Sequence, residues 1–417
     1  MGRTSFPKGH GRWPIAARYS QGVRAGPLIF VGGQGDLDGQ GRVCHAGDLA
    51  AQTGASVRAL GAVLEDLGAG LSDLVNLVAF YVPEPGAPEG AMLRHLRRAL
   101  GEEPMPTVSA IPVPYLSLPG LRVLIEGIAM RSEGGAVLAR RSAAPAGHWR
   151  WPEGGGFAQG VHSGEMIFVS GQMALDGAGQ VIGPDDIVRQ SEIVMENMAA
   201  VLAELGATLK DAVRFNIFYR GTGTTKDWEV AARVRARYFE EPGPCATGIP
   251  VPRFDREGLA IAMWVWAMVA EDGRPIPRQH VWPEGSWDWS FHLPYKHGLK
   301  CRNLVFVGGQ VPLDAKSQTL AKHDGIAQTH IAMGYLSRVL HALGLGLDDI
   351  VKINGYHGDD SGEAGLVRNL AVRQQFFAAP GPVTTETPLP FLAIDDMRVE
   401  IEAVAAVPAS GRSSVFR

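Results

Sequence analysis

The chain has 417 residues, of which 46% are hydrophobic and 20% charged, and its formal net charge is −4. At roughly 150 residues per domain, this length predicts about three domains, each large enough to bury its own core. Lys and Arg are scattered and form no basic tail or basic helix face, so we expect no nucleic-acid partner. No apolar run reaches the ~18 residues of a membrane helix, and the chain opens without the apolar stretch of a signal peptide. We therefore expect a cytoplasmic protein without membrane contact.

Cysteine and cofactor motifs exclude several further classes. The three cysteines, Cys44, Cys245 and Cys301, form no CxxC pair, and their odd number argues against a disulfide framework. No GxGxxG follows a predicted strand, and no P-loop is present. The histidine spacings match no metal signature. The sequence therefore predicts neither a cofactor nor a metal.

The predicted elements of the first third follow a strand–helix–strand order. LIFVGGQ (28–34) predicts a strand that breaks at glycine. Residues 48–68 carry apolar side chains at helical spacing, and LVNLVAFYV (74–82) predicts a second strand. A last strand is LRVLIEGIAM (121–130), and a second amphipathic helix is clearest in WEVAARVRARYF (228–239). This order predicts an α+β fold, a mixed sheet with two helices on one face.

The chain repeats this pattern three times. IFVGGQ (29–34) returns as IFVSGQ (167–172) and again, after an equal interval, as VFVGGQ (305–310). The same interval, called here the repeat interval, relates Gln52, Gln190 and Gln328; Gly68, Gly206 and Gly344; Asp73, Asp211 and Asp349; Pro106, Pro244 and Pro382; and Ala129, Ala267 and Ala405. It spans a whole domain, far more than a solenoid unit of roughly 20–50 residues. We predict three tandem domains, at 1–138, 139–276 and 277–417, called below the first, second and third copies.

The repeated motifs resemble the Rid family (YjgF, reactive-intermediate deaminases). The first copy carries RYSQGV, FVGGQ and AQTGASVRALGAVLEDLG, and the third carries PYKHG, FVGGQ and AQTHIAMGYLSRVLHALG. The resemblance implies a homotrimer with a ligand cleft at each subunit interface, so three copies in one chain imply an intramolecular pseudo-trimer, with further oligomerisation left open. Tethering lets the three clefts diverge, which the symmetry of a homotrimer forbids.

One family residue is missing from all three copies. The family's deaminases hold a substrate carboxylate with the Arg of a PAR-S/T motif, because a guanidinium matches a carboxylate bidentately. Here the motifs are PTVSAIPV, PCATGIPV and PVTTETPL, which place Val108, Ala246 and Thr384 at the arginine position. The imine and enamine deaminase activity is therefore not carried over to this chain.

The resemblance places the acidic candidates in the third copy. The first Glu of the family's EIEA motif corresponds to Glu400, against Leu124 and Ala262 in the other copies, and Glu386 follows the missing arginine by two residues. Two carboxylates in one partly buried cleft repel, which raises the pKa of one and makes it a candidate general acid. Glu386 and Glu400 are therefore the catalytic candidates. The alternatives are a solvated loop residue for Glu386 and a surface charge or interface ion pair for Glu400.

The ligand-binding candidates lie around these acids. The family's opening tyrosine corresponds to Tyr19 and Tyr295, with Phe157 in the second copy, and the resemblance implies that backbone N–H groups near Gly309 face a substrate carbonyl. The full set is Tyr295, Gly309, Thr384, Thr385, Tyr19 and Ser109. The alternatives are interface packing for the tyrosines and ordinary strand positions for the threonines. We expect the working cleft to be built around Thr384, Thr385, Glu386, Glu400 and Tyr295.

A Trp-Pro segment precedes each copy. Trp13, Trp151 and Trp289 keep the repeat interval. Such a segment is either an aromatic plug that fastens each copy to its neighbour or a lid over a flat, unsaturated ligand.

The sequence thus favours a cytoplasmic enzyme that acts on a small nitrogen-containing or carbonyl metabolite by hydrolysis, deamination or tautomerisation in an inter-domain cleft. The alternative is a non-catalytic small-molecule-binding or scaffold protein on the same fold.

Overall fold

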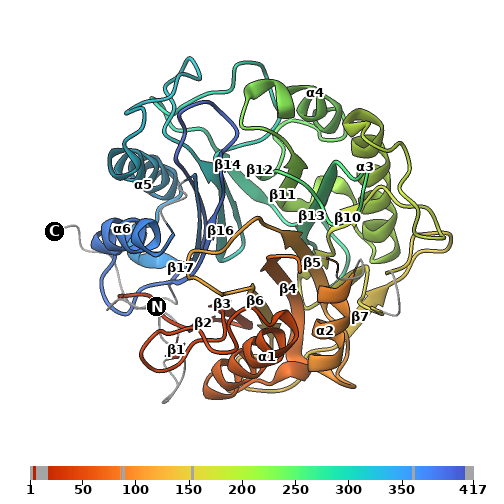
Figure 1. Cartoon of the computed structure of the whole chain (residues 1–417). Helices are drawn as coiled ribbons and strands as arrows, with labels where there is room; N and C mark the ends of the chain where they lie inside the picture. Colours follow the sequence, from red (N-terminus) through yellow and green to blue (C-terminus); the bar gives the residue numbers. More distant parts are fainter. Residues whose placement is uncertain are drawn as a thin grey trace.

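The computed structural model describes residues 3–5, 17–84, 86, 90–151, 155–358 and 362–408. Three similar units surround a common centre, with the sheets inside and the helices outside (Figure 1). Each unit has a mixed sheet and two α-helices, so the predicted α+β fold and the three tandem domains are confirmed. The boundaries at 138/139 and 276/277 stay predictions. Among the described residues, no helix combines the length and the apolar character needed to span a bilayer.

The three units share one strand order. The first unit contains β1 (Arg3–Ser5), β2 (Gly22–Ala25), β3 (Leu28–Gln34), α1 (Leu49–Asp66), β4 (Leu74–Tyr81), α2 (Ala91–Leu100), β5 (Thr107–Pro112) and β6 (Val123–Met130). Its sheet runs β1-β2-β3-β6-β4-β5, with β4 and β5 parallel and all other neighbours antiparallel.

The second and third units repeat this order. The second contains β7 (Arg140–Ala143), β8 (Gly160–Ser163), β9 (Met166–Val169), β10 (Gln172–Met173), α3 (Ile187–Glu204), β11 (Ala212–Arg220), α4 (Thr225–Ala236), β12 (Cys245–Val251) and β13 (Ile261–Met268). The third contains β14 (Arg278–Val281), β15 (Gly298–Cys301), β16 (Leu304–Gln310), α5 (Gly325–Ala342), β17 (Ile350–His357), α6 (Glu363–Arg373), β18 (Val383–Pro388) and β19 (Val399–Ala406). Short 3-10 turns precede β4, β11 and β17, and another follows α6.

The repeated glutamine of the long helix has a structural cause. Gln52 is fully buried, its Nε2 donates to the carbonyl of Gly120 at 2.8 Å, and its Oε1 accepts from the backbone N–H of Arg122 at 2.6 Å. Gln190 and Gln328 make the equivalent pairs in the other units. A buried amide that pairs with both a carbonyl and an N–H fastens the helix to the loop before the last strand, and both polar ends of the glutamine side chain are satisfied by these bonds.

The units meet in a closed ring. Between the first and second, Gly171 donates its N–H to the carbonyl of Val108 at 3.0 Å. Between the second and third, β12 packs on β16 so closely that a Cβ at Gly308 would lie 2.7 Å from the carbonyl oxygen of Ala246. Between the third and first, Ser20 donates its N–H to Pro382 at 3.0 Å. These contacts confirm the predicted intramolecular pseudo-trimer.

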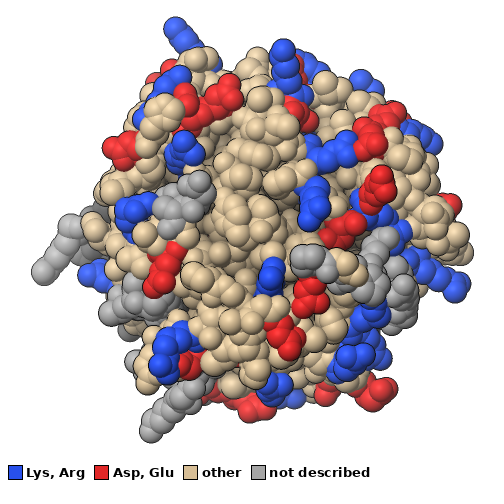
Figure 2. Space-filling view, in the orientation of Figure 1, with Lys and Arg blue, Asp and Glu red and all other residues tan. Residues whose placement is uncertain are grey.

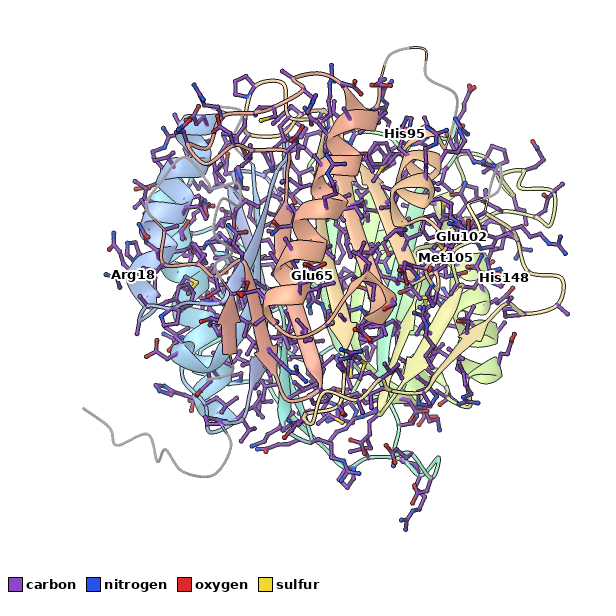
Figure 3. The ribbon with its side chains drawn as sticks, turned by 90° about the horizontal axis from the view of Figure 1, so that it is seen from below. Arg18, Glu65, His95, Glu102, Met105 and His148 are labelled. Atoms are coloured by element: carbon purple, nitrogen blue, oxygen red, sulfur yellow. The ribbon has the colours of Figure 1, made fainter. Side chains whose placement is uncertain are left out.

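The N-terminal segment of each copy lies against the copy before it. Arg18 belongs to the first copy, yet its Nη1 donates to the carbonyl of Phe377 in the third at 2.7 Å. Figure 3 shows Arg18 beside the third copy, on the opposite side of the first copy from His148. Each interface therefore combines the β18-type strand of one copy with the opening segment of the next.

Aromatic rings and buried charges fill the centre. Phe80, Phe218 and Tyr356, one from each copy, lie 5.9–6.3 Å apart between ring centroids. Beside them Lys352 pairs with Glu126 of the first copy at 2.7 Å. Figure 2 shows the charged side chains of one face mostly around its rim, with an uncharged middle. The buried Lys352–Glu126 pair therefore connects the third copy with the first.

Candidate functional site

The candidate residues of the third copy do not share one cleft. Tyr295 packs on Phe215 and Phe239 of the second copy, with ring centroids 6.0 and 5.8 Å apart. Tyr19 packs instead on Phe377 of the third copy, at 5.9 Å. The opening tyrosines of the first and third copies thus each enter the cleft of the preceding copy. The expectation that Tyr295 and Glu386 line the same cleft is wrong, because sequence order does not show which neighbour an opening segment reaches.

A pocket lies between the second and third copies and is called here the 2/3 cleft. Its lining includes Tyr219, Trp228, Arg235 and Gly248 from the second copy, and Trp289, Tyr295 and Glu400 from the third. Trp289 belongs to the Trp-Pro segment and packs edge-on against Trp228, with ring centroids 5.5 Å apart. Trp13, the first of the three repeated tryptophans, lies outside the described residues.

Glu400 enters this pocket from β19 and is 4% exposed. Its carboxyl lies directly over Gly309, where any Cβ would collide with it. Burial and the negative charge of Glu402 raise the pKa of Glu400 well above its ordinary value, and a hydrogen bond from the backbone of Gly248 offsets only part of this. Burial and the charge of Glu402 therefore favour the protonated form of Glu400. The carboxylate whose charge raises the pKa of Glu400 is Glu402. The sequence predicted Glu386 in this role.

Glu402 lies two residues further along β19 and is an anion. Burial opposes its charge, but Arg214, Thr247, Asn216 and Lys352 lower its pKa below the ordinary value. It forms an ion pair with Arg214, and Tyr356 donates its hydroxyl to Glu402 at 3.0 Å. The side chains of residues two apart in a strand share one face. The strand therefore places a carboxyl whose pKa is lowered beside one whose pKa is raised.

Arg235 is a pocket residue that the sequence reasoning did not single out. It lies on α4, is 3% exposed, and forms no ion pair with a carboxylate among the described residues. Burial lowers its pKa, and the hydroxyls of Tyr295 and Tyr219 are its polar neighbours. Its Nε and Nη1 lack hydrogen-bond partners. The signal was present in the sequence, because Arg97, Arg235 and Arg373 keep the repeat interval.

The cleft between the third and first copies, called the 3/1 cleft, contains the equivalent arginine. Arg373 and Glu386 form a fully buried ion pair. Thr384 donates its Oγ1 to Glu386 at 2.6 Å, and the ring of Tyr19 lies 5.8 Å from the guanidinium carbon of Arg373. Burial raises the pKa of Tyr19 to about 12, so this hydroxyl is neutral. The carboxylate of Glu386 is therefore already engaged by its own copy.

Thr385 points elsewhere. Its hydroxyl bonds Glu126 of the first copy, beside Lys352, so it belongs to the central ion-pair network. Thr247, the equivalent residue of the second copy, bonds Glu402 in the same way. The two threonines therefore connect neighbouring copies at the centre.

The remaining cleft lies between the first and second copies. It is lined by Tyr81, Ser109, Trp151, Asp255 and Ala262. Ala262 replaces the acid found as Glu400 in the 2/3 cleft, and the hydroxyl of Tyr81 bonds Asp255. Ser109 is 1% exposed, and its hydroxyl has no partner. Among its described lining residues, this cleft has Ala262 and no buried acid at the position of Glu400.

Two other kinds of site, a reactive Cys245 thiol and a metal centre, are not supported by the described residues. Cys245 is fully buried, burial raises its pKa to about 12, and its thiol lies 3.1 Å from the carbonyl oxygen of Phe306. A neutral, enclosed thiol is a packing residue. Within the ranges that the structure describes, no three His, Cys, Asp or Glu side chains gather as a metal site would require.

Comparison with known proteins agrees with the fold. The model of the endoribonuclease L-PSP family matches residues 12–131, 151–269 and 290–407. The chain belongs to this family, in three copies. A RutC family protein of Pyrococcus abyssi is 31% identical over 105 residues, which are 25% of this chain and 80% of that protein. Protein DfrA of Myxococcus xanthus is 38% identical over 96 residues, 23% of this chain and 71% of that protein. The family is the one that the Rid-like motifs indicated.

One solved structure spans most of the chain. A chorismatase aligns with 80% of this chain and 93% of its own length, with a TM-score of 0.52 and 15% sequence identity. At this identity the likeness concerns the fold. The fold over most of this chain is therefore similar to that of the chorismatase structure, while the chemistry of this chain rests on its own clefts.

Proposed function

We propose that this L-PSP family protein is an enzyme that acts on a small metabolite in the 2/3 cleft, with Glu400 as the proton donor. The observation that carries the proposal is a buried carboxyl that lines a pocket, has no cationic partner among the described residues and has a pKa raised by burial and by Glu402. Buried acids with raised pKa values are typical of catalytic sites. A structural acid would be expected to pair with a base, as Glu386 and Glu402 do.

The neighbours of Glu400 suit a proton donor. A carboxylic acid that is still protonated near neutral pH can give its proton to a developing oxygen or nitrogen anion of the substrate. The carboxylate left behind keeps its hydrogen bond from the backbone of Gly248. The anionic Glu402 nearby favours return of the proton. This chemistry serves hydrolysis, deamination or tautomerisation of a nitrogen-containing or carbonyl metabolite.

Glu386 has a different role in this proposal. Its ion pair with Arg373 is fully buried. Glu386 therefore stabilises the interface, and Glu400 alone supplies acid chemistry. Tyr295 and Gly309 remain site residues, since the first faces Arg235 and the second leaves room for the carboxyl of Glu400.

The alternative is a non-catalytic binding protein. It is favoured by Val108, Ala246 and Thr384, which replace the family's substrate-binding arginine in all three copies. In that case the same pocket would bind a ligand without converting it. The cytoplasmic location stays a prediction.

The test separates the two. Small carbonyl and nitrogen-containing metabolites are screened for stabilisation of the protein on heating and for product formation. Glu400→Gln keeps the shape of the acid without its proton, so it should retain binding and lose turnover by roughly 10²- to 10⁴-fold. Glu240→Gln, an exposed position, is the matched control. Turnover by Glu400→Gln at the rate of the unaltered protein would exclude Glu400 as the acid.

A further inference from the structure

We infer that Arg235 forms a carboxylate-binding subsite in the 2/3 cleft, so that the ligand is a small acid with a flat, apolar body. This inference shares its pocket with the proposed function but concerns binding alone.

The 3/1 cleft provides an internal precedent. There the equivalent arginine, Arg373, binds the carboxylate of Glu386, and both side chains are fully buried. In the second copy Gly248 takes the position of Glu386. A Cβ built on Gly248 would meet no other atom within 4 Å. The chain has thus kept the arginine and removed the carboxylate, which leaves open space beside it.

The surroundings of Arg235 leave it without a counter-charge. Asp227, an acidic side chain on the same helix, accepts from the backbone N–H of Thr222 and Thr224 at 2.6 and 3.1 Å. The hydroxyls of Tyr219 and Tyr295 are neutral at neutral pH, since burial raises the pKa of both. A buried guanidinium without an anion is unfavourable, and a carboxylate can accept two parallel hydrogen bonds from it. The site therefore selects an anion.

The rest of the pocket describes the body of the ligand. Trp228 and Trp289 line it together with Tyr219. Aromatic walls of this kind favour a flat apolar group. Tyr219 is a neighbour of both Arg235 and Glu400, so a ligand held by Arg235 extends toward the acid. Its carboxylate and its reactive group thus belong to one small molecule.

One difference between the two clefts decides which substitutions would reproduce the arginine–glutamate pair of the 3/1 cleft in the 2/3 cleft. Gly355, on the strand beside Glu386, leaves room for the Arg373–Glu386 pair, because a Cβ there would collide with both side chains. The equivalent residue of the second copy is Ile217, which lines the pocket. Reproducing the closed state therefore needs Ile217→Gly together with Gly248→Glu.

The first experiment uses benzoate, phenylacetate and phenylpyruvate, each against its neutral carboxamide. Binding is measured by calorimetry and by thermal stabilisation of the full chain. At least one acid should bind, roughly tenfold or more tightly than its amide, and Arg235→Gln should abolish the difference. Arg235→Lys, which keeps the charge without the planar fork, should retain part of it. Equal binding of acid and amide, binding unaffected by Arg235→Gln, or no binding of any acid at millimolar concentration would each overturn the inference.

The second experiment introduces a glutamate beside Arg235, in the position proposed for the carboxylate of the ligand. The double variant Ile217→Gly/Gly248→Glu should lose carboxylate binding, while Ile217→Gly alone should keep it. Carboxylate binding by a folded double variant at the affinity of the unaltered protein would contradict the inference. Glu400→Gln, which tests the proposed function, should leave carboxylate binding intact, so the two ideas can fail separately.

Discussion

The 2/3 and 3/1 clefts have the same arrangement of elements but differ in the side chains that line them. Both keep a buried arginine, Arg235 or Arg373, and an opening tyrosine from the next copy. The 3/1 cleft also contains Glu386, which neutralises its arginine, whereas the 2/3 cleft has Gly248 there and lines its pocket with Glu400. The polar candidates that the sequence favoured as one site thus divide into a closed interface and an open pocket. The absence of a side chain at Gly248 distinguishes the proposed site from the 3/1 cleft more clearly than the presence of Glu400.

The largest expected effect is a loss of stability when the buried ion pair of the 3/1 cleft is removed. Glu386→Ala leaves the buried guanidinium of Arg373 without its anion, and removing one partner of such a pair costs about 3–5 kcal/mol. Unfolding in urea, followed by circular dichroism, should show this loss. Glu229→Ala, which removes a partner of the half-exposed Arg233, is the control and should change stability by less than about 1 kcal/mol. A similar small change for Glu386→Ala would show that the buried pair does not stabilise the interface.

The second prediction concerns Gly309, which has no side chain and so leaves room for the carboxyl of Glu400. Gly309→Ala places a methyl group against its carboxyl, which must then move, at a cost of about 1–3 kcal/mol and with loss of activity. Gly33→Ala is the matched change in the 3/1 cleft, where a Cβ would lie 3.0 Å from a methyl group of Thr385. Urea titrations and turnover of both variants check the difference. Equal loss of activity in the two would mean that displacing Glu400 is not the cause.

The third prediction concerns pH. The pKa of Glu400 is raised by folding, so the native state holds a proton that the unfolded state has released. The stabilisation by this proton is complete below the ordinary pKa of 4.5 and is lost as pH rises toward the raised value, by up to about 1.4 kcal/mol per pH unit. Activity should fall over the upper part of the same range, because the donor must be protonated.

Thermal unfolding of the unaltered protein and of Glu400→Gln across pH 4–8 checks this. The stability difference between the two should grow with pH in favour of the glutamine variant. Parallel pH profiles would mean that Glu400 titrates normally.

The smallest effect is expected in the open cleft. Arg235→Met removes a buried charge that has no anion in the unliganded protein, so its stability should change by less than about 1 kcal/mol or rise. The same change at Arg373 would leave Glu386 unpaired and should cost about 3–5 kcal/mol. Urea titrations of the two methionine variants compare the clefts directly. A large loss for Arg235→Met would reveal a structural partner for this side chain.

Much of the fold could be predicted from the sequence. The constant repeat interval, the predicted strand and the amphipathic helix recur because each copy must build the same sheet and cover it with the same helices. The predicted break of that strand at glycine is wrong, because β3 and β16 continue through their glycines to Gln34 and Gln310. Gln52, Gln190 and Gln328 repeat because each satisfies the same buried backbone groups. Constraints of this kind act within one copy, so the sequence of that copy contains them.

The candidate site could not be predicted in the same way, because it is formed by contacts between copies. Tyr295 lies on the third copy but faces Arg235 of the second, and Glu386 is neutralised by Arg373, which lies 13 residues away in the chain. The sequence shows which side chains are acids and arginines. Burial, and the choice of neighbour across each interface, decide which of them are paired and which keep an altered pKa. Electrostatic free energies depend on distance and desolvation, and both are set only when the three copies close into a ring.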